Sequence, residues 1–455
     1  MALPLYKSVR RLLSEYVARL LDQQAYQAKA KNLVDSSKES SSIEYEDTSP
    51  SLWDDDIGAM LSSMLQMAGY TPRMNTCHRE VFASYIAPSL GVHPKLLGSS
   101  EGWRSFMTDD FTPVELSWRW SPSSELPSVR YSIEPIGLCA GSTRDPLNTQ
   151  ASVDLIAELE KRSSNLSLDW HRHFSKTLLV SGQESKPWEI GTSEVPHSHL
   201  SQIFLAFDLD ESSQLKTYYL PMWRAASLQK STLMVVGESI KSLAISSPNL
   251  GIAFDLIAQY IDSCAVGKKP RIEIVSTNCT TSSDPSIKIY LRSHETSLNS
   301  VIDTMNLGER LVNLDSSFLS SLQELWCLVL GISPSDVSSS LPERTHETSG
   351  ILYYFEIKSS SAFPTPKVYI PAKHYGKSDH EVAKGLSTFL ERRGKRLANE
   401  SYFEGVASLC SHRSLSDGLG IHTYISCAPK GPDCTITSYI NPEIYHTSRS
   451  LRKEN

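Results

Sequence analysis

The sequence lacks the features that mark several large classes of protein. No uninterrupted run of 18 apolar residues occurs, so no transmembrane helix is expected. Basic residues are not in excess: 44 Lys and Arg stand against 51 Asp and Glu, and the formal net charge of −7 argues against a nucleic-acid-binding protein. The motifs GxSxG, HExxH and GxGxxG and the P-loop are missing, so the sequence gives no support to a hydrolase or a metalloenzyme.

Cysteine is present at an ordinary level and without the spacing of a metal site. The eight cysteines form no CxxC pair, and four of them lie in apolar surroundings: Cys139, Cys264, Cys327 and Cys410. This pattern predicts free, mostly buried thiols in a reducing compartment, and we therefore expect a cytoplasmic protein.

Two N-terminal segments differ from the rest of the chain. Residues 1–34 are amphipathic and basic without a continuous apolar stretch, which predicts a surface helix rather than a signal peptide; a transit peptide is the alternative. Residues 35–52 are rich in serine and acidic residues, which predicts a flexible linker. We expect one long domain over 53–447 and a short tail over 448–455.

The long domain contains a concealed repeat. Pairs of short strand-like segments alternate with stretches that have room for two helices, such as 153–162 with 169–178. An additional helical region, 57–69 with 78–88, precedes the first pair. The sequence predicts five strand pairs, at 113–120 with 128–136, 202–209 with 214–220, 271–277 with 285–292, 350–357 with 366–371, and 421–427 with 434–440.

The predicted strands have one apolar face and one face of charged residues and tyrosines, because side chains alternate along a strand. Trp118 and Trp120 lie on an apolar face, and we expect them to face the helices. The polar faces carry Glu115, Ser117 and Arg119; Arg130, Ser132 and Glu134; Lys216 and Tyr218; Lys288, Tyr290 and Arg292; and Lys367 and Tyr369.

Two architectures fit this alternation. A half-solvated antiparallel sheet would turn its polar face to water. An α/β fold in which ten antiparallel strands close into a barrel, built from repeated ααββ units with the helices outside, would instead enclose the polar faces in a lumen. The recurrence of lysine or arginine with tyrosine favours the barrel. Such a lumen suits an allylic diphosphate, whose leaving group is anionic and whose prenyl fragment becomes a carbocation.

Six segments carry a resemblance to a known family. They are TDDFTPVELSWRW, VRYSIEPIG, LAFDLDESSQLKTYYLP, IKIYLRS, GILYYFEIKSSSAFPTPKVYIPAKHYGKSD, and IHTYISCAPK followed by TITSYINPE. In order and spacing they resemble the fungal dimethylallyl-tryptophan-synthase family of aromatic prenyltransferases, over about residues 53–447. The resemblance implies a ten-stranded barrel of ααββ units, and transfer of a prenyl group, dimethylallyl in the first place, to an aromatic carbon, nitrogen or oxygen.

The resemblance also implies that no metal or other cofactor is needed, because the family does without the metal-binding DDxxD motif of other prenyl-transfer enzymes. The sequence agrees with this. Its aspartate cluster at 54–56 stands at a predicted helix start, where we expect it to cap the helix. Asp109 and Asp110 are expected to be turn residues, and His374 is expected to be structural.

Site residues follow from the resemblance by position. Glu115 falls on the acidic residue that accepts a hydrogen bond from the indole N–H of the acceptor, a bond that strengthens as the arenium ion forms. Arg271 is a candidate partner for an acceptor carboxylate or carbonyl, or else a solvated strand-end residue. The donor diphosphate would be bound by Arg130, Lys216, Lys288 and Lys367, beneath a shield of Tyr218, Tyr290, Tyr369 and Tyr424. The tyrosine rings would stabilise the allylic cation and exclude water.

Three positions depart from the family's pattern. Ser286 and Leu419 stand where the family usually has arginines that neutralise the diphosphate, and Arg292 and His422 are candidates to replace them. Phe204 stands where members that prenylate free tryptophan at C4 have a lysine, so we expect that reaction to be disfavoured.

We predict an aromatic prenyltransferase that acts on an indole-containing acceptor, such as an indole diterpene or a tryptophan-containing cyclic dipeptide. A polycyclic phenol is an alternative acceptor, and a family member that only binds a hydrophobic ligand is an alternative function. The proton acceptor is open between Glu115, His422 and a water molecule. The expected partners are an allylic diphosphate and an aromatic small molecule, with no nucleic acid, no stable membrane anchor, and a monomer or loose homodimer as the oligomeric state.

Overall fold

The computed structural model describes residues 48–97, 102–163, 166–180, 199–210, 214–281, 284–311 and 314–450. The chain divides into two compact units, Met1–Thr48 and Ser49–Asn455, and the described residues belong almost entirely to the second. The segment predicted for 1–34 and most of the linker predicted for 35–52 lie outside the described residues. Residues 48–53 are helical, so the last residues assigned to the linker belong to a helix.

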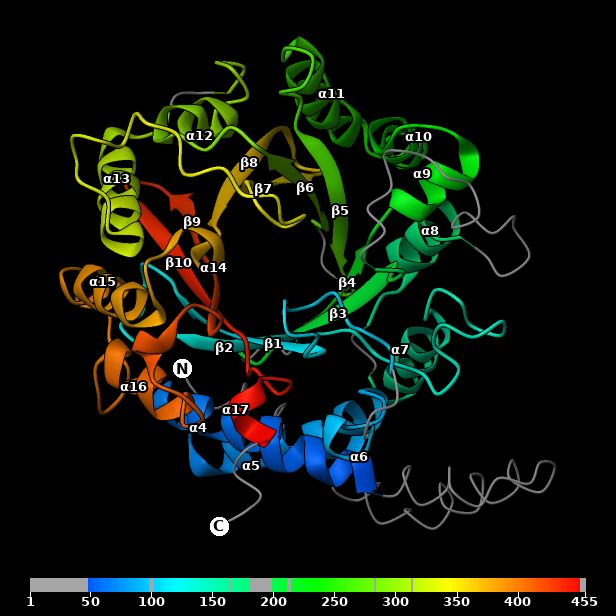
Figure 1. Ribbon diagram of the computed structural model, residues 1–455. Coiled ribbons are helices and arrows are strands. Elements are labelled where there is room, and N and C mark those ends of the chain that lie inside the picture. Colours follow the sequence, from blue (N-terminus) through cyan, green and yellow to red (C-terminus); the bar gives the residue numbers. More distant parts are fainter. Residues whose placement is uncertain are drawn as a thin grey trace, which may run out of the picture. The chain divides into compact units, whose positions relative to one another are not determined.

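Ten antiparallel strands form a closed barrel (Figure 1). They are β1 (Val114–Trp120), β2 (Ser128–Ile133), β3 (Ile203–Asp208), β4 (Leu215–Tyr219), β5 (Arg271–Asn278), β6 (Ser286–Ser293), β7 (Ile351–Lys358), β8 (Ser361–Ile370), β9 (His422–Lys430) and β10 (Asp433–Ile440). Each strand pairs with its neighbours in sequence, and β1 pairs with β10 to close the ring. The predicted barrel is thus confirmed, and the half-solvated open sheet is excluded.

Helices surround the barrel and connect its strand pairs (Figure 1). The predicted helices 153–162 and 169–178 are confirmed as α7 and α8 between β2 and β3. The helical elements are η1 (Asp54–Gly58), α4 (Ala59–Met67), α5 (Pro72–Val81), η2 (Phe82–Ile86), η3 (Ala87–Ser89), α6 (Pro94–Leu97), α7 (Gln150–Arg162), α8 (Asp169–Leu178), α9 (Met222–Leu228), α10 (Thr232–Ala244), α11 (Pro248–Ser263), α12 (Leu298–Met305), α13 (Ser316–Leu330), α14 (Ala372–Tyr375), α15 (Asp379–Glu391), α16 (Tyr402–Leu409), η5 (Leu415–Asp417) and α17 (Thr447–Ser450).

The main hydrophobic core lies between the barrel and the helices. Trp118 and Trp120 are buried there as predicted, and both rings contact the ring of Tyr402 in α16. Their indole N–H groups are satisfied by backbone carbonyls, at 3.2 Å from Met64 O and 3.3 Å from Arg396 O. The outward strand faces therefore anchor the helices, which leaves the polar faces for the lumen.

The aspartate cluster at 54–56 has a different role from the predicted one. Residues 48–53, which precede the cluster, are already helical, so these aspartates lie beyond the position of a cap. Asp54 instead accepts a hydrogen bond of 2.6 Å from Arg79 Nε, and Asp56 pairs with Lys95 Nζ at 2.6 Å. The capping prediction was wrong because residues 48–53, which were assigned to a linker, are helical.

Other predictions about the chain are confirmed. Asp109 and Asp110 lie in a turn, and all eight cysteines are free. Within the described residues, no helix is both long and apolar enough to cross a membrane.

Gly385 of α15 provides a test of the helix packing. A Cβ atom added at Gly385 would collide with the backbone carbonyl oxygen of Leu328 in α13. We expect Gly385→Ala to lower the free energy of unfolding by about 1–3 kcal/mol, because the two helices must move apart. The control is Gly418→Ala, where no heavy atom lies within 4 Å of the added Cβ. Urea denaturation measures both; equal losses in the two variants would contradict the described contact.

Candidate active site

A cavity of about 1340 Å³ opens at one end of the barrel lumen. The loops around 106–107 and 347–348 contribute to its wall together with the lumen faces of the strands. The structure brings seven residues of the sequence prediction into this one cavity: Glu115, Phe204, Tyr218, Arg271, Tyr290, Tyr369 and Tyr424.

Glu115 is held in the cavity wall by a long-range hydrogen bond. Thr423 Oγ1 donates to Glu115 Oε1 at 2.6 Å. Burial raises the pKa of Glu115 to about 7, and the bond from Thr423 opposes this rise. A carboxyl group whose pKa lies near neutrality can exist as a carboxylate and still take up a proton, as a general base must.

A β-bulge in β9 brings Thr423 to Glu115. Ser438 of β10 pairs with Ile425, whereas Ile440 pairs with His422, so β9 has one residue more than β10 in this interval. Thr423 and Tyr424 therefore both face the lumen: the first contacts Glu115 and the second lines the cavity.

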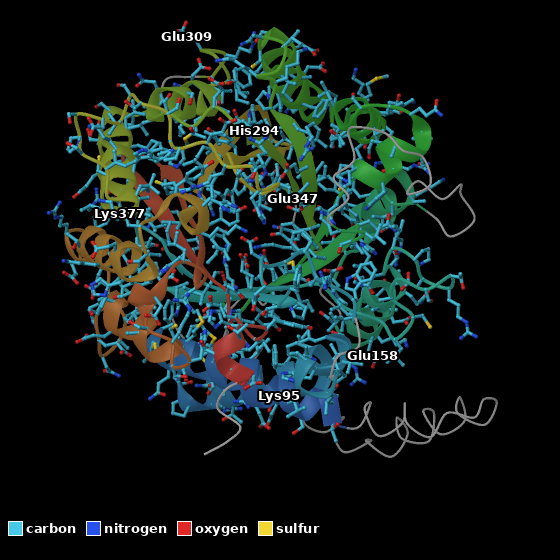
Figure 2. The ribbon with its side chains drawn as sticks, in the orientation of Figure 1. Lys95, Glu158, His294, Glu309, Glu347 and Lys377 are labelled. Atoms are coloured by element: carbon cyan, nitrogen blue, oxygen red, sulfur yellow. The ribbon has the colours of Figure 1, made fainter. Side chains whose placement is uncertain are left out.

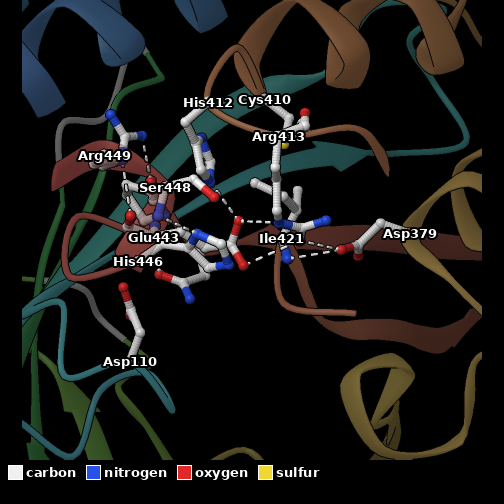
Figure 3. Close-up of polar contacts among 12 residues, drawn as sticks. Asp110, Asp379, Cys410, His412, Arg413, Ile421, Glu443, His446, Ser448 and Arg449 are labelled. Atoms are coloured by element: carbon white, nitrogen blue, oxygen red, sulfur yellow. Dashed lines mark hydrogen bonds and ion pairs between the residues drawn. The ribbon is translucent and has the colours of Figure 1, made fainter. Parts of the chain in front are cut away.

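Asp379, the first residue of α15, fixes the start of β9 (Figure 3). Its carboxylate accepts hydrogen bonds from Ile421 N at 3.1 Å, from His422 N at 3.0 Å and from Arg413 Nη2 at 2.6 Å. Arg413 also binds Glu443, with 2.8 Å between Nε and Oε2. This buried network connects α15, the segment before β9 and the segment after β10, and so determines where the bulge lies.

His422 is part of this network and not of the lumen. Its Nδ1 lies 2.9 Å from Asp379 Oδ1, its Nε2 lies 3.0 Å from the Tyr402 hydroxyl, and the residue is fully buried. Both ring nitrogens are thus engaged outside the barrel. The hypotheses that His422 accepts the proton or replaces a diphosphate-binding arginine are both wrong, because the bulge reverses the side on which it points.

Five basic side chains lie on the lumen faces farther from the cavity opening. This cation cluster consists of Arg119, Arg130, Lys216, Lys288 and Lys367. Asp208 Oδ2 pairs with Lys216 Nζ at 2.5 Å and with Arg130 Nη2 at 3.0 Å. Glu356 pairs with Lys288 Nζ at 3.3 Å. The structure therefore brings together all four residues predicted to bind the diphosphate.

Lys367 makes no ion pair with any described residue. Its Nζ lies 3.4 Å from the Tyr439 hydroxyl and 4.8 Å from the centre of the Tyr369 ring. Burial, together with the neighbouring cations, lowers its pKa well below the usual value, and burial lowers the pKa of Lys216 to about 7. An entering polyanion would reverse both effects, so the cluster is suited to bind one.

Three positions bear on the positive charge expected near the diphosphate: Ser286, Leu419 and Arg292. Ser286 donates a hydrogen bond of 2.8 Å to Glu356 Oε1, and Leu419 packs against the hydrophobic core. Arg292 lies four residues along β6 from Lys288, which corresponds to about 13 Å, and it is paired with Glu273. Arg292 thus does not replace a missing arginine. Arg119, which shares the strand face of Glu115, adds positive charge to the cluster instead.

A group of six tyrosines connects the cavity with the cation cluster. Four are the predicted ones, and Tyr354 and Tyr439 join them. Ring centres of neighbours lie 5.5 to 6.1 Å apart across Tyr218, Tyr290, Tyr354, Tyr369, Tyr424 and Tyr439. Ring faces at this spacing provide a surface that attracts a cation and excludes water.

The outer part of the cavity combines aromatic walls with charged groups. Phe204 stacks on Tyr218 with ring centres 4.3 Å apart, and Phe106 contacts Phe204 at 5.3 Å. Arg271 lies here with its side chain 46% exposed, and its Nη2 is 2.7 Å from Glu273 Oε1. An aromatic acceptor with a polar substituent fits this arrangement.

Two groups of possible metal ligands occur in the described part of the chain. They are Asp109 with His346 and His374, and Cys410 with His412 and Glu443. The protein's own cations already neutralise both carboxylates: Lys373 binds Asp109 at 2.6 Å, and Arg413 binds Glu443. His374 Nε2 lies 2.7 Å from Thr348 Oγ1, which agrees with a structural role.

Comparison with known proteins identifies the family. Residues 50–405 match the family described as tryptophan dimethylallyltransferase. The chain belongs to this family. The predicted resemblance is therefore confirmed, and the protein is an aromatic prenyltransferase that transfers an allylic group from its diphosphate to an aromatic acceptor.

Individual relatives cover most of the chain. It is 40% identical to the 4-O-dimethylallyl-L-tyrosine synthase of Claviceps purpurea, over 88% of this chain and 89% of the relative. It is 34% identical to the 7-dimethylallyltryptophan synthase of Aspergillus fumigatus, over 88% and 86%. The crystal structure of NotF in complex with brevianamide F and DMSPP has the same fold, with a TM-score of 0.73, 22% identity, and coverage of 87% of this chain and 95% of that one.

Several residues of this prenyltransferase site were missed by the sequence analysis. Arg119, Tyr354 and Tyr439 carried a usable signal, because strand alternation alone places them on lumen faces. Other wall residues come from connecting loops, from bulged strand positions or from the single-turn helix α14, where no periodicity indicates direction: Phe106, His199, Glu273, Glu347, Lys373 and Thr423.

The Thr423 hydrogen bond predicts a shift in pH dependence. Thr423→Val removes the bond that lowers the pKa of Glu115, so that pKa should rise further above 7. A carboxyl group acts as a general base only as its carboxylate, which is lost as pH falls through this pKa. For Glu115 in that role, we expect the acid limb of the kcat/KM profile to move to higher pH. Thr423→Ser, which keeps the hydroxyl, is the matched control. Superimposable acid limbs in the two variants, measured between pH 5.5 and 9, would show that Thr423 does not control Glu115.

Proposed function

We propose that the protein transfers a dimethylallyl group from dimethylallyl diphosphate to the side chain of a free aromatic amino acid, with tyrosine as the first candidate. The observation that carries this proposal is a single cavity in which the tyrosines connect the buried carboxyl group of Glu115 with the cation cluster. The relatives named for 4-O-dimethylallyl-L-tyrosine and 7-dimethylallyltryptophan support an amino acid as acceptor.

The cation cluster would bind and activate the donor. Diphosphate oxygens would accept hydrogen bonds from Lys216 and Lys367 and bring both lysines back to their protonated form. The bond between C1 of the donor and its oxygen then breaks, and the electron pair leaves with the diphosphate. The positive side chains stabilise this leaving group, and the tyrosine rings stabilise the allylic cation. In this proposal, lysines and arginines do the work that a metal ion does in other prenyl-transfer sites.

Glu115 would complete the reaction on the acceptor side. The phenolic oxygen of tyrosine attacks the allylic cation, a C–O bond forms, and the phenolic proton passes to the Glu115 carboxylate. Thr423 holds that carboxylate at 2.6 Å from its hydroxyl, so the base is positioned before the acceptor binds. For an indole acceptor, the same carboxylate would accept the N–H hydrogen bond.

An indole-containing acceptor larger than an amino acid is the second candidate. The stacked pair of Phe204 and Tyr218, with ring centres 4.3 Å apart, and the cavity volume of about 1340 Å³ favour it. This is the acceptor class that the sequence analysis predicted. Polycyclic phenols, the alternative acceptors of the sequence analysis, are included in the same assay.

The test is an assay of the purified protein with dimethylallyl diphosphate and EDTA, analysed by mass spectrometry. The acceptors are tyrosine, tryptophan, a tryptophan-containing cyclic dipeptide, an indole diterpene and a polycyclic phenol. We expect the mass of one dimethylallyl group to be added to tyrosine. Glu115→Gln should lower kcat by about 100-fold, since general base catalysis contributes about 10²–10⁴. Lys216→Met should raise the KM for the donor.

The control for both variants is Lys268→Met, because the Lys268 side chain is 60% exposed and pairs only with Glu295 among the described residues. Lys268→Met should have the same kcat and the same KM for the donor as the unmodified protein. A folded protein that transfers no prenyl group to any acceptor would contradict the proposal and favour the alternative of ligand binding alone.

A further inference from the structure

The acceptor end of the cavity carries a second charged group, separate from the cation cluster. Arg271, Glu273, His199 and Glu347 all line it. We propose that Glu273, assisted by His199 and Glu347, binds the α-ammonium group of an amino-acid acceptor. This inference rests on the proposed function, because it needs an acceptor that carries a free amino group.

A second β-bulge directs Glu273 into the lumen. Ile272 of β5 pairs with Leu291, and Ile274 pairs with the adjacent Tyr290, so Glu273 is an additional residue in β5. Tyr290 faces the lumen, and its partner Ile274 lines the cavity beside Glu273. The bulge thus puts two consecutive side chains on the lumen face.

Two arginines bind Glu273, and one of them is far more exposed than the other. Arg292 Nε lies 2.8 Å from Glu273 Oε2, its Nη1 donates to Thr348 O at 2.8 Å, and its side chain is 5% exposed. Arg271 Nη2 binds the other oxygen, Oε1, at 2.7 Å, but the Arg271 side chain is 46% exposed. The contact between Arg271 and Glu273 is therefore the one that opens more readily, because water can solvate the half-exposed guanidinium while Arg292 keeps Glu273 paired.

An amino-acid acceptor can exchange partners with this pair without any change in charge. Its carboxylate would bind Arg271, which then turns away from Glu273. Its ammonium group would take the place of the Arg271 guanidinium at Glu273 Oε1, while Arg292 continues to hold Oε2. Every charged group has a partner before and after binding, which avoids the cost of an unpaired buried charge.

His199 supplies a second acceptor for the ammonium N–H groups. Its ring stacks on Phe106 with ring centres 4.9 Å apart, and its buried Nδ1 has no hydrogen-bond partner among the described residues. Burial lowers the pKa of His199, so the ring is neutral, and its hydrogen bond to the backbone of Ser201 leaves Nδ1 as an acceptor. A buried acceptor without a partner is a place for a ligand donor.

Glu347 adds a second negative charge near His199. It belongs to the segment before β7, and it lies over the inner side of the helix ring, whereas Lys95, Glu158, Glu309 and Lys377 lie at the outer rim (Figure 2). The carboxylates of Glu347 and Glu273 both act electrostatically on His199. An ammonium group placed beside His199 would thus be attracted by both carboxylates.

The consequence is discrimination against acceptors without a free amino group. Such an acceptor leaves Glu273 with one partner and His199 Nδ1 with none once Arg271 has turned to the carboxylate. Sites built to bind a polar group reject analogues that lack it. We expect the kcat/KM for tyrosine to exceed that for 3-(4-hydroxyphenyl)propanoate, its analogue without the amino group, at least tenfold.

The experiment measures this preference ratio in the full-length protein with dimethylallyl diphosphate, using tyrosine and 3-(4-hydroxyphenyl)propanoate, and in parallel tryptophan and indole-3-propanoate. Glu273→Gln should reduce the ratio at least tenfold. Glu295→Gln is the matched control, since Glu295 is exposed and pairs with Lys268, and it should preserve the ratio. His199→Phe, which keeps the stacked ring but lacks Nδ1, is the second variant if Glu273→Gln fails to fold, and it should also reduce the ratio.

The outcomes separate this inference from the proposed function. If the protein prenylates tyrosine and its deaminated analogue with similar kcat/KM, the ammonium site is refuted while the proposed function stands. A ratio that stays within twofold in a folded Glu273→Gln or His199→Phe variant refutes it equally. If neither amino acid is prenylated, the proposed function has failed, and the inference fails with it.

Discussion

Mutual repulsion among the cations of the lumen is the constraint on which the rest of this site depends. Arg119, Arg130, Lys216, Lys288 and Lys367 act on one another in a space with little water, and Asp208 and Glu356 neutralise only part of their charge. Neutral tyrosines lie beside these cations, since their ring faces and hydroxyls tolerate cations without adding full charges. The barrel is therefore complementary to a polyanion, and binding of one would relieve the repulsion among these cations.

Two β-bulges interrupt the regular alternation of the strands, and both contribute side chains to the acceptor end of the cavity. The bulge in β9 sends Thr423 and Tyr424 into the lumen together, and the bulge in β5 does the same for Glu273 and Ile274. Both occur near the open end of the barrel, where the aromatic acceptor would bind. A strictly alternating barrel would offer one polar side chain for every two residues, which suits a diphosphate. The bulges add groups at closer spacing, as the recognition of a small polar substituent requires.

The sequence analysis predicted the regularly alternating strand positions, but it failed at bulges and loops. Alternation along the strands is a local property, so it indicated the ten strands and the polar faces of the lumen. The assignment of four cations on those faces to a diphosphate came from the family resemblance. The direction of His422 was not predictable, because it depends on an extra residue in β9 that only pairing with β10 reveals. Thr423, His199 and Glu347 were missed for a related reason: loops and bulges place side chains through tertiary contacts, for which short-range periodicity carries no signal. The aspartates at 54–56 were misassigned because the serine-rich, acidic composition before them indicated a linker, whereas residues 48–53 are helical.

The pairing of β1 with β10 also has a consequence for how the chain folds during its synthesis. Glu115 and Thr423 are 308 residues apart in sequence, and their hydrogen bond forms only when the last strands join the first. During synthesis, β1 must wait with one edge unpaired until nearly the whole polypeptide has been made, and contacts of such long range form slowly. The candidate base therefore cannot reach its final position in a growing or shortened chain. The hydrogen bond between Glu115 and Thr423 and the closed ring of strands therefore form together.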